Sequence, residues 1–318
     1  MAIVRLSSRP SRARTELDAG RYAPTPSGDL HLGNLRTALL AWAFARSTGR
    51  RFLLRMEDLD PARTGAEARQ LADLAAIGLD WDGPVVRQSE RLPHYQAAID
   101  RLTAAGHTYE CFCTRKEIQQ AATAPHAPMG AYPGTCRTLT ESDRAALRAQ
   151  GRQAALRLRS TATEFVIFDY LHGYYRGQVD DLVLRRGDGI PAYNLAVVVD
   201  DAAQGIDQVV RADDLLPSTP RQAYLATLLD LPVPRYAHVP LVLNAEGQRL
   251  AKRDGAVTMA DQLALGSTPE QIVALLADSL GYTATTAAEL LDSFDPAHLP
   301  HEPWILDGNG LLQRSRCP

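Results

Sequence analysis

Apolar residues recur at helical spacing near the start of the chain. Five of them stand at i, i+3, i+4, i+7 and i+8, on one face of an α-helix: Leu35, Ala38, Leu39, Trp42 and Ala43. Asn34 precedes this face, and its side-chain oxygen can accept an amide hydrogen bond of the first turn, so we expect Asn34 to be the N-cap. Two prolines and a glycine lie just upstream. The pattern therefore predicts a helix that begins directly after a stiff loop.

The next apolar segments alternate between strand and helix patterns. Arg51–Met56 is typical of a buried strand, whereas Ala66–Ile77 is helical and ends at Gly78. Pro93–Ala105 is a further helix, which the following glycine closes. Strands that alternate with helices predict a parallel sheet, here one half of a doubly wound α/β fold.

Residues 107–190 interrupt this alternation. In order, they contain a cysteine cluster, a loop rich in alanine, proline and glycine, a charged helix and two short β-like runs: 111–113, Ala121–Gly134, Glu141–Gln150, Ala154–Leu158 and Phe165–Phe168. We interpret this region as an insertion between the two halves of a nucleotide-binding fold.

Apolar sequence of β character returns after the insertion, at Ala192–Val199 and Gln208–Arg211. A helix is predicted over Ser218–Leu229 and a strand over His238–Leu243. The 65 residues after Arg253 are mostly helical. Because a typical domain needs roughly 100–150 residues, we expect this last part to be only a small helical module.

Composition and charge exclude several classes of protein. The chain has 318 residues, of which 45% are hydrophobic and 22% charged, as is ordinary for a globular protein of about two domains. No apolar run reaches the length of a membrane span. The net charge of −3 gives no overall basic surface for nucleic acid. Any RNA contact would therefore need a local patch of basic residues. One such patch is present, and it is interpreted equally well as an ordinary solvated surface. That patch comprises Arg144, Arg148, Arg152, Arg157 and Arg159.

Three further compositional features narrow the picture. Residues 1–17 are basic and have no long apolar core, so we expect a disordered tail in a cytoplasmic protein. Three of the four cysteines cluster, which favours a metal site over disulfides. Among 34 basic residues only Lys116 and Lys252 are lysines. Because lysine is a compact charge that arginine cannot always replace, Lys252 becomes a candidate functional residue.

The start of the first predicted helix offers a site for phosphate. His31 and Gly33 stand where free backbone amides and the helix dipole favour an anion. Over residues 24–34 the order is Pro-x-Pro-x-Gly-x-x-His-x-Gly-Asn. This order resembles the HIGH signature of class I aminoacyl-tRNA synthetases, in its glutamyl form.

A second motif follows the strand predicted at His238–Leu243. Gln248–Arg253 resembles the KMSKS loop of the same family, with Lys252 in the second lysine slot. Arg249 occupies the first lysine slot and Ala251 the serine slot, which are departures from the pattern. The resemblance implies that His31 and Lys252 are catalytic. With Gly33 and Asn34, they would bind ATP, accompanied by Mg²⁺, and stabilise charge on the leaving pyrophosphate.

The resemblance extends over about residues 20–260. Its other segments are Met56–Arg63, Leu79–Pro84, Gln88–Arg91 with Tyr95, Pro191–Asp201 and Val210–Leu215. It implies the α/β Rossmann-like fold of class I synthetases, with a zinc-containing insertion. The predicted parts are the tail at 1–17, the two halves of the catalytic domain at 18–106 and 191–260, an acceptor-binding-like insertion at 107–190, and a helical stem-contact-like module at 261–318.

A glutamate pocket must supply an anion for the ammonium group and cations or donors for two carboxylates. Glu57 can hold the ammonium group, and the planar guanidinium groups of Arg21 and Arg211 suit the side-chain carboxylate. Glutamine would leave buried positive charge unpaired, at a cost on the order of a few kcal/mol. The resemblance implies an amino-acid site lined by Arg21, Tyr22, Ala23, Pro24, Thr25, Glu57, Tyr193 and Arg211.

The cysteine cluster predicts one structural zinc site. Cys111 and Cys113 are too close in sequence for a good disulfide, but with Cys136 they can meet one metal ion. The usual zinc-bearing glutamyl enzymes end this motif in Cys-x-His, and that histidine is missing here. Tyr132 matches the fourth ligand of the short glutamyl-Q tRNA(Asp) synthetases, and His126 is the alternative that ligand chemistry favours.

The combined motifs resemble those short synthetases most. The resemblance implies that glutamate is activated with ATP without tRNA and is transferred to queuosine at the wobble position of tRNA(Asp). The short segment after residue 253 is consistent with this, because it leaves no room for a separate anticodon-binding domain. We expect a cytoplasmic monomer. Three alternatives stay open: a short glutamyl-tRNA synthetase that charges tRNA(Glu), a different nucleotidyl transferase, and a non-catalytic RNA-binding paralogue.

Overall fold

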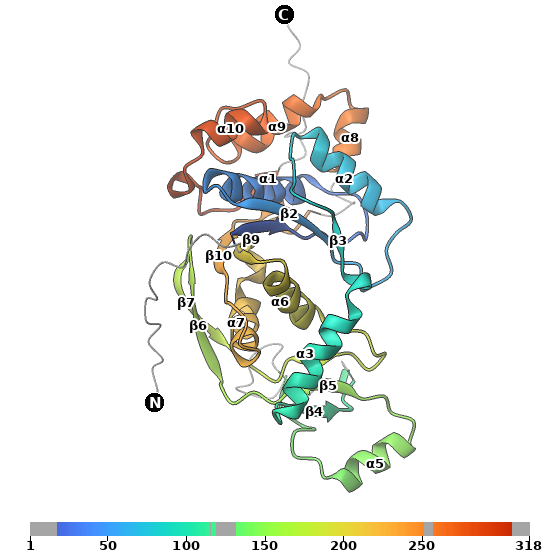
Figure 1. Ribbon diagram of the computed structural model, residues 1–318. Coiled ribbons are helices and arrows are strands. Elements are labelled where there is room, and N and C mark those ends of the chain that lie inside the picture. Colours follow the sequence, from blue (N-terminus) through green and yellow to red (C-terminus); the bar gives the residue numbers. More distant parts are fainter. Residues whose placement is uncertain (1–17, 115, 119–131, 251–256, 307–318) are drawn as a thin grey trace, which may run out of the picture.

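A seven-stranded sheet forms the centre of the molecule (Figure 1). The computed structural model describes residues 18–114, 116–118, 132–250 and 257–306. The sheet order is β3-β2-β1-β9-β10-β6-β7, and all neighbours are parallel except β6 and β7. The strands are β1 (Ala19–Tyr22), β2 (Arg51–Met56), β3 (Val86–Arg87), β6 (Glu164–Asp169), β7 (Gly173–Gln178), β9 (Ile206–Ala212) and β10 (Arg235–Val239). The predicted doubly wound parallel sheet is therefore confirmed.

Helices cover both faces of this sheet (Figure 1). One layer contains α1 (Leu32–Ser47), α2 (Ala66–Ala76), α8 (Met259–Ala264), α9 (Pro269–Asp278) and α10 (Ala287–Ser293). The opposite layer contains α3 (Leu92–Ala104), α6 (Tyr193–Ala203) and α7 (Thr219–Leu228). One apolar core packs the first layer against the sheet, and a second lies between the sheet and α7 of the opposite layer, as a two-sided α/β fold requires. No helix among the described residues is long and apolar enough to cross a bilayer.

Helix α1 is the most deeply buried helix of the first layer, and its N-terminus differs from our expectation. His31, not Asn34, is the N-cap. The His31 Nδ1 atom accepts the Asn34 amide at 3.2 Å, and the Asn34 side-chain oxygen accepts the His31 amide at 3.2 Å. This reciprocal pair satisfies two orphan amides at once, which a single cap at position 34 could not do.

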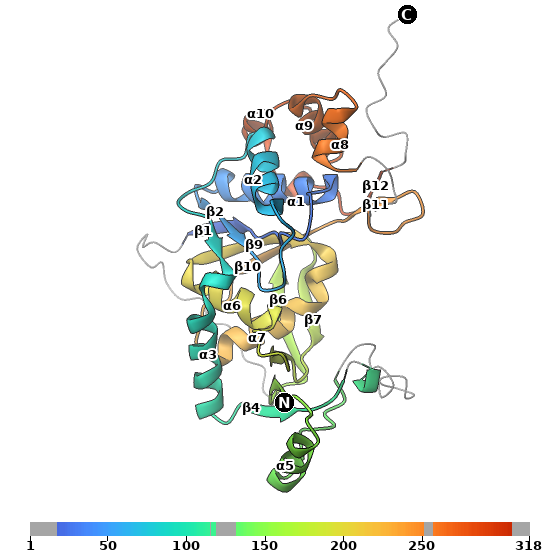
Figure 2. The same ribbon diagram turned by 90° about the vertical axis from the view of Figure 1, so that its right-hand side faces the viewer.

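The insertion supplies strands to two sheets. Its β4 (Thr108–Cys111), β5 (Ala155–Leu158) and β8 (Val183–Arg185) form an antiparallel sheet away from the main one (Figure 2). Helix α5 (Glu141–Ala149) lies beside it, whereas β6 and β7 extend the main sheet. The predicted domain boundaries, including the tail at 1–17 outside the described residues, stay predictions.

The prediction of β structure at Ala192–Val199 is wrong, because this segment begins helix α6. Its continuous apolar run fits a buried strand and a buried helix equally well, and packing between α3, α7 and the sheet decides for the helix. The strand predicted at His238–Leu243 is divided by Pro240 into β10 and β11 (Val242–Asn244). Strand β12 (Trp304–Leu306) pairs with β11, and short 3₁₀ turns occur at η1 (Gln88–Glu90), η2 (Asp213–Ser218) and η4 (Pro296–His298).

Candidate active site

A cavity of about 700 Å³ opens at the carboxyl ends of β1, β2 and β9. This edge is where open α/β sheets bind their ligands. The predicted amino-acid residues all line it, from the segment 21–25 to Glu57, Tyr193 and Arg211. His31, Gly33 and Asn34 line the same cavity. The fold thus brings together predicted site residues that lie far apart in the sequence.

His31 presents a neutral imidazole at the helix start. Burial lowers the pKa of His31, and the nearby charge of Arg249 lowers it further. Because Nδ1 accepts the Asn34 amide, the proton of the neutral ring is on Nε2. A Cβ atom at Gly33 would lie 3.1 Å from the imidazole ring and 3.2 Å from the Cβ of Val242. Glycine is therefore what lets the ring stand close to the first turn of α1.

The proline-containing loop before His31 is anchored by Gln70, which the sequence analysis did not identify. Gln70 Nε2 donates to the carbonyl of Thr25 at 3.0 Å and to that of Gly28 at 2.7 Å. The side chain is only 2% exposed. The available signal was a polar residue on the buried face of α2, between Ala66 and Leu74.

Arg211 is a buried cation surrounded by neutral groups. Its guanidinium donates from Nε to His238 Nε2 at 3.1 Å, and from Nη2 to Thr219 Oγ1 at 2.8 Å and Gln222 Oε1 at 2.7 Å. Nη1 lies 3.5 Å from the hydroxyl of Tyr193. The side chain is 5% exposed, and no carboxylate of the described ranges forms an ion pair with it. Nη1 is thus the part of the guanidinium left for a ligand.

Arg21 differs from Arg211 because it has a carboxylate partner. Its Nε and Nη2 donate to the two oxygens of Asp201 at 3.1 and 3.5 Å. Asp201 also accepts from Arg55 at 2.8 Å, and Arg55 in turn lies 3.3 Å from a carboxylate oxygen of Glu57. Burial raises the pKa of Glu57, while the two arginines oppose that rise. Sequence reasoning gave no role to Asp201 or Arg55.

The second motif is only partly described. Arg249 lines the cavity and contacts Asp214 at the start of η2. Lys252 and Ala251 lie outside the described residues, so the role of Lys252 stays a prediction. The arginine patch suggested for RNA is mostly engaged within the protein: Arg148 and Arg152 pair with glutamates, and Arg157 stacks on Tyr132.

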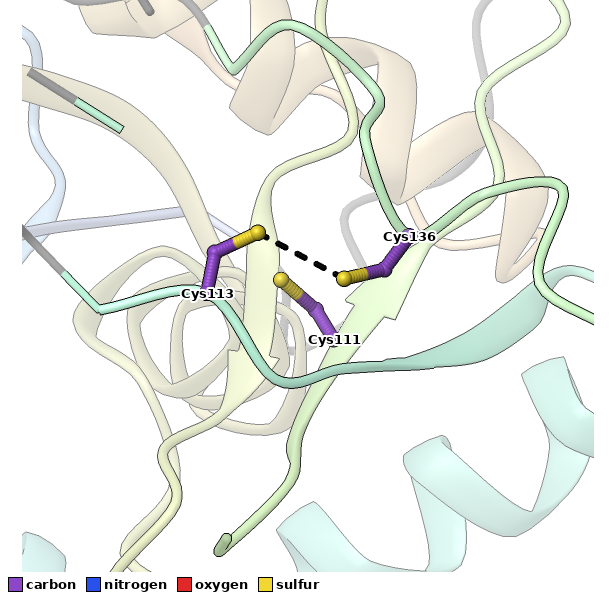
Figure 3. Close-up of side chains that lie close together, drawn as sticks. All are labelled: Cys111, Cys113 and Cys136. Atoms are coloured by element: carbon purple, nitrogen blue, oxygen red, sulfur yellow. Dashed lines mark hydrogen bonds between the residues drawn. The ribbon is translucent and has the colours of Figure 1, made fainter. Parts of the chain in front are cut away.

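The three clustered cysteines converge beside β4, where their side chains point toward one another (Figure 3). Their sulfur atoms lie within 4.8 Å of one another. The Tyr132 hydroxyl oxygen is 3.3 Å from Cys111 Sγ and 3.6 Å from Cys113 Sγ. Sulfur ligands of one tetrahedral zinc ion stand about 3.8 Å apart, so the donor set fits such an ion. His126, the alternative ligand, lies outside the described residues.

Comparisons with known proteins agree with this geometry. A family model for class I tRNA synthetases (E and Q), catalytic domain, matches residues 19–300. The glutamyl-Q tRNA(Asp) synthetase of Nocardia farcinica is 76% identical over 94% of this chain and 96% of its own length. The glutamyl-Q tRNA(Asp) synthetase of Cutibacterium acnes is 56% identical over 83% of this chain and 76% of its own length.

Solved structures give the same result. A glutamate tRNA ligase from Elizabethkingia meningosepticum, crystallised with its amino acid, superimposes with a TM-score of 0.79 at 27% identity. The match covers 93% of this chain and 68% of that one. With the HIGH-like helix start in the cavity and the family match over most of its length, this chain belongs to the class I tRNA synthetases of the glutamyl and glutaminyl type, which are ATP-dependent ligases.

Proposed function

We propose that this protein activates L-glutamate with ATP, without tRNA, and transfers the glutamate to queuosine at the wobble position of tRNA(Asp). The observation that carries the choice of amino acid is Arg211. A buried guanidinium without an anionic partner among the described residues is costly, and a ligand carboxylate relieves that cost.

The cavity can hold glutamate by its three charged groups. Nη1 of Arg211, the hydroxyl of Tyr193 and Nη1 of Arg21 are available to the side-chain carboxylate, since Asp201 occupies the other edge of Arg21. Glu57 supplies the anion for the ammonium group. Glutamine brings no negative charge to Arg211, so the same site disfavours it.

ATP would bind at the start of α1. The amide of Gly33 and the Nε2–H of His31 are donors for phosphate oxygens, whereas the Asn34 amide is already donated to His31. Lys252 would add a cation from the second motif. Mg²⁺ accompanies ATP. An oxygen of the glutamate α-carboxylate attacks the α-phosphorus of ATP and forms a bond to it. The bond between the α-phosphorus and the oxygen that bridges it to the β-phosphorus breaks, and pyrophosphate leaves. Catalysis then rests on positioning and charge stabilisation.

The acceptor follows from the relatives. Proteins named glutamyl-Q tRNA(Asp) synthetase match this chain over most of its length, and we propose the same acceptor here. The recipient is then a hydroxyl of the cyclopentene-diol of queuosine. We also propose that the protein acts as a monomer in the cytoplasm.

Two measurements test this function. Glutamate-dependent exchange of pyrophosphate into ATP, without tRNA, tests the activation step. Transfer of radiolabelled glutamate to tRNA(Asp) with and without queuosine tests the acceptor. We expect labelling only of the queuosine-containing tRNA. Charging of tRNA(Glu) instead would establish a glutamyl-tRNA synthetase, and no exchange would rule out activation.

We further propose that Cys111, Cys113, Tyr132 and Cys136 hold one structural zinc ion. The support is the convergence of three sulfurs and one phenol oxygen in a small buried cluster. Tyr132→Phe keeps the ring beneath Arg157 and removes only the ligand atom. We expect the variant to lose zinc to a chelator faster than the parent protein, measured by metal analysis. Unchanged retention would assign the fourth position to another ligand such as His126.

A further inference from the structure

Behind Arg211 lies a pair of buried residues that the proposed chemistry does not use. Asp169 ends β6 and His238 lies in β10, and both are completely buried. Their contact joins Oδ2 of Asp169 to Nδ1 of His238 at 2.6 Å. The other ring nitrogen, Nε2, faces Arg211 Nε at 3.1 Å and Thr219 Oγ1 at 2.9 Å.

The hydrogen-bond partners fix the protonation state of the ring. Asp169 is surrounded by donors, because its carboxylate also accepts the amides of Leu171, His172 and His238 at 3.0 to 3.1 Å. An ionised carboxylate only accepts, so Nδ1 of His238 must carry the proton. Nε2 is then a bare acceptor, which is what the Nε–H of Arg211 requires. If Nε2 carried the proton, two N–H donors, Nε2 of His238 and Nε of Arg211, would face each other at 3.1 Å without an acceptor between them.

The arrangement also determines where the negative charge of Asp169 lies relative to Arg211. A carboxylate bonded directly to Arg211 would compete with a ligand, as Asp201 occupies one edge of Arg21. The imidazole separates Asp169 from Arg211, so the negative charge lies behind the guanidinium and the cavity side stays unpaired. The remaining groups around His238 are the stacked ring of Tyr236 and the side chain of His172, which contacts the His238 carbonyl at 3.2 Å.

We propose that Asp169 and His238 are positioning residues for glutamate: the carboxylate fixes the imidazole tautomer that holds Arg211 with Nη1 toward the ligand. This inference rests on the proposed function, since it concerns the same amino-acid site. It assigns a specificity role to two residues that contact neither substrate.

Asp169→Asn is the sharpest test. The amide oxygen can still accept backbone amides, but the amide nitrogen meets Nδ1 as a donor and drives the proton to Nε2. In Ser-His-Asp triads the same exchange leaves the imidazole in the wrong tautomer. We expect the KM for glutamate in pyrophosphate exchange to rise by about tenfold or more, while the KM for ATP changes by less than about twofold. The preference for glutamate over glutamine should fall as well.

Two substitutions of His238 separate positioning from packing. His238→Gln can carry an amide oxygen to the place of Nε2, whereas His238→Asn reaches only the place of Nδ1. We expect His238→Gln to retain more glutamate affinity than His238→Asn. His172→Asn is the matched control, because the His172 side chain is exposed and makes no contact with Arg211. Thermal unfolding of each variant verifies that it is folded.

The outcomes are distinguishable. If the parent protein shows no glutamate-dependent exchange, the proposed function fails and this inference fails with it. If the parent exchanges pyrophosphate but Asp169→Asn leaves the KM for glutamate unchanged, or raises both KM values alike, only the positioning role is overturned. An equal loss in His238→Gln and His238→Asn would likewise overturn the role of Nε2.

Discussion

The two buried arginines of the cavity, Arg21 and Arg211, show how strongly the partners of a residue determine its charge environment. Arg21 is neutralised by Asp201, whereas Arg211 is held by a histidine, a threonine and a glutamine. One arginine of the cavity is therefore paired with a carboxylate, whereas the other has only neutral hydrogen-bond partners. Of these two buried arginines, Arg211 is the one without a carboxylate partner among the described residues, so we expect it to distinguish glutamate from glutamine.

Arg211→Gln should reduce this discrimination. Hydrogen bonds to charged groups contribute about 1.5–3 kcal/mol, so we expect the KM for glutamate to rise by about 10- to 100-fold. The measurement is pyrophosphate exchange with glutamate and with glutamine. Arg235→Gln is the control, because Arg235 is an exposed arginine at the amino end of β10, away from the cavity at the carboxyl ends of the strands. An unchanged glutamate-to-glutamine ratio would contradict the prediction.

His238 also predicts how stability depends on pH. Burial lowers the pKa of His238 to about 4, from the 6.5 of an unfolded chain. Between these values the unfolded state binds more protons, so stability is lost as pH falls through this window. For this group we expect a loss of about 2–3 kcal/mol between pH 7 and pH 4.5. Urea unfolding at both pH values should show a smaller loss in His238→Asn, and equal losses would contradict the assignment.

At the scale of elements, the site depends on how α2 holds the loop before α1. Gln70 reaches from α2 to the carbonyls of Thr25 and Gly28, and the loop delivers His31 to the start of α1. One helix thus fixes the N-terminal geometry of another. The capping box at His31 completes this arrangement by using Nδ1 internally and leaving Nε2 to the cavity.

Gln70→Met should loosen the loop. Two carbonyls lose their donor, and an unsatisfied buried group costs about 1–3 kcal/mol. We expect a lower Tm and a fall of about tenfold in kcat/KM for ATP in pyrophosphate exchange. Gln96→Met provides the comparison, because Gln96 is exposed on α3. Normal kinetics in Gln70→Met would show that the loop is held by other contacts.

At the scale of the whole molecule, two regions have separate cores. The cysteine cluster lies in a small apolar cluster with Tyr109 and Phe112, distinct from the clusters that pack against the main sheet. The cavity belongs to the main sheet. We therefore expect the proposed activation site and the proposed metal site to be structurally separable.

Chelation tests this separation. We expect a chelator to increase proteolysis around β4 and β5 while glutamate-dependent pyrophosphate exchange changes by less than about twofold. Proteolytic fragments and exchange rates are measured on the same samples. A parallel loss of exchange and metal would mean that the two regions act as one unit.

Much of the fold and site could be predicted because the signals are local. The β2 and α2 segments and the end of α3 before Gly106 follow from apolar periodicity and glycine. The segment before α1 combines prolines, histidine and glycine in one short stretch. Helix α6 was mistaken for β structure because an apolar run without periodicity fits both.

The sequence by itself determined the α/β class, the candidate phosphate site at the helix start, the cysteine cluster and the candidate glutamate residues. Each of these depends on the spacing or the type of a few residues close together in the sequence. Only the tertiary structure decided which of these groups are neutralised and which stay unpaired. Asp169 and His238 are 69 residues apart, and Arg21 and Asp201 are 180 apart. Electrostatic and hydrogen-bond partners are set by proximity in space, which local sequence patterns do not encode.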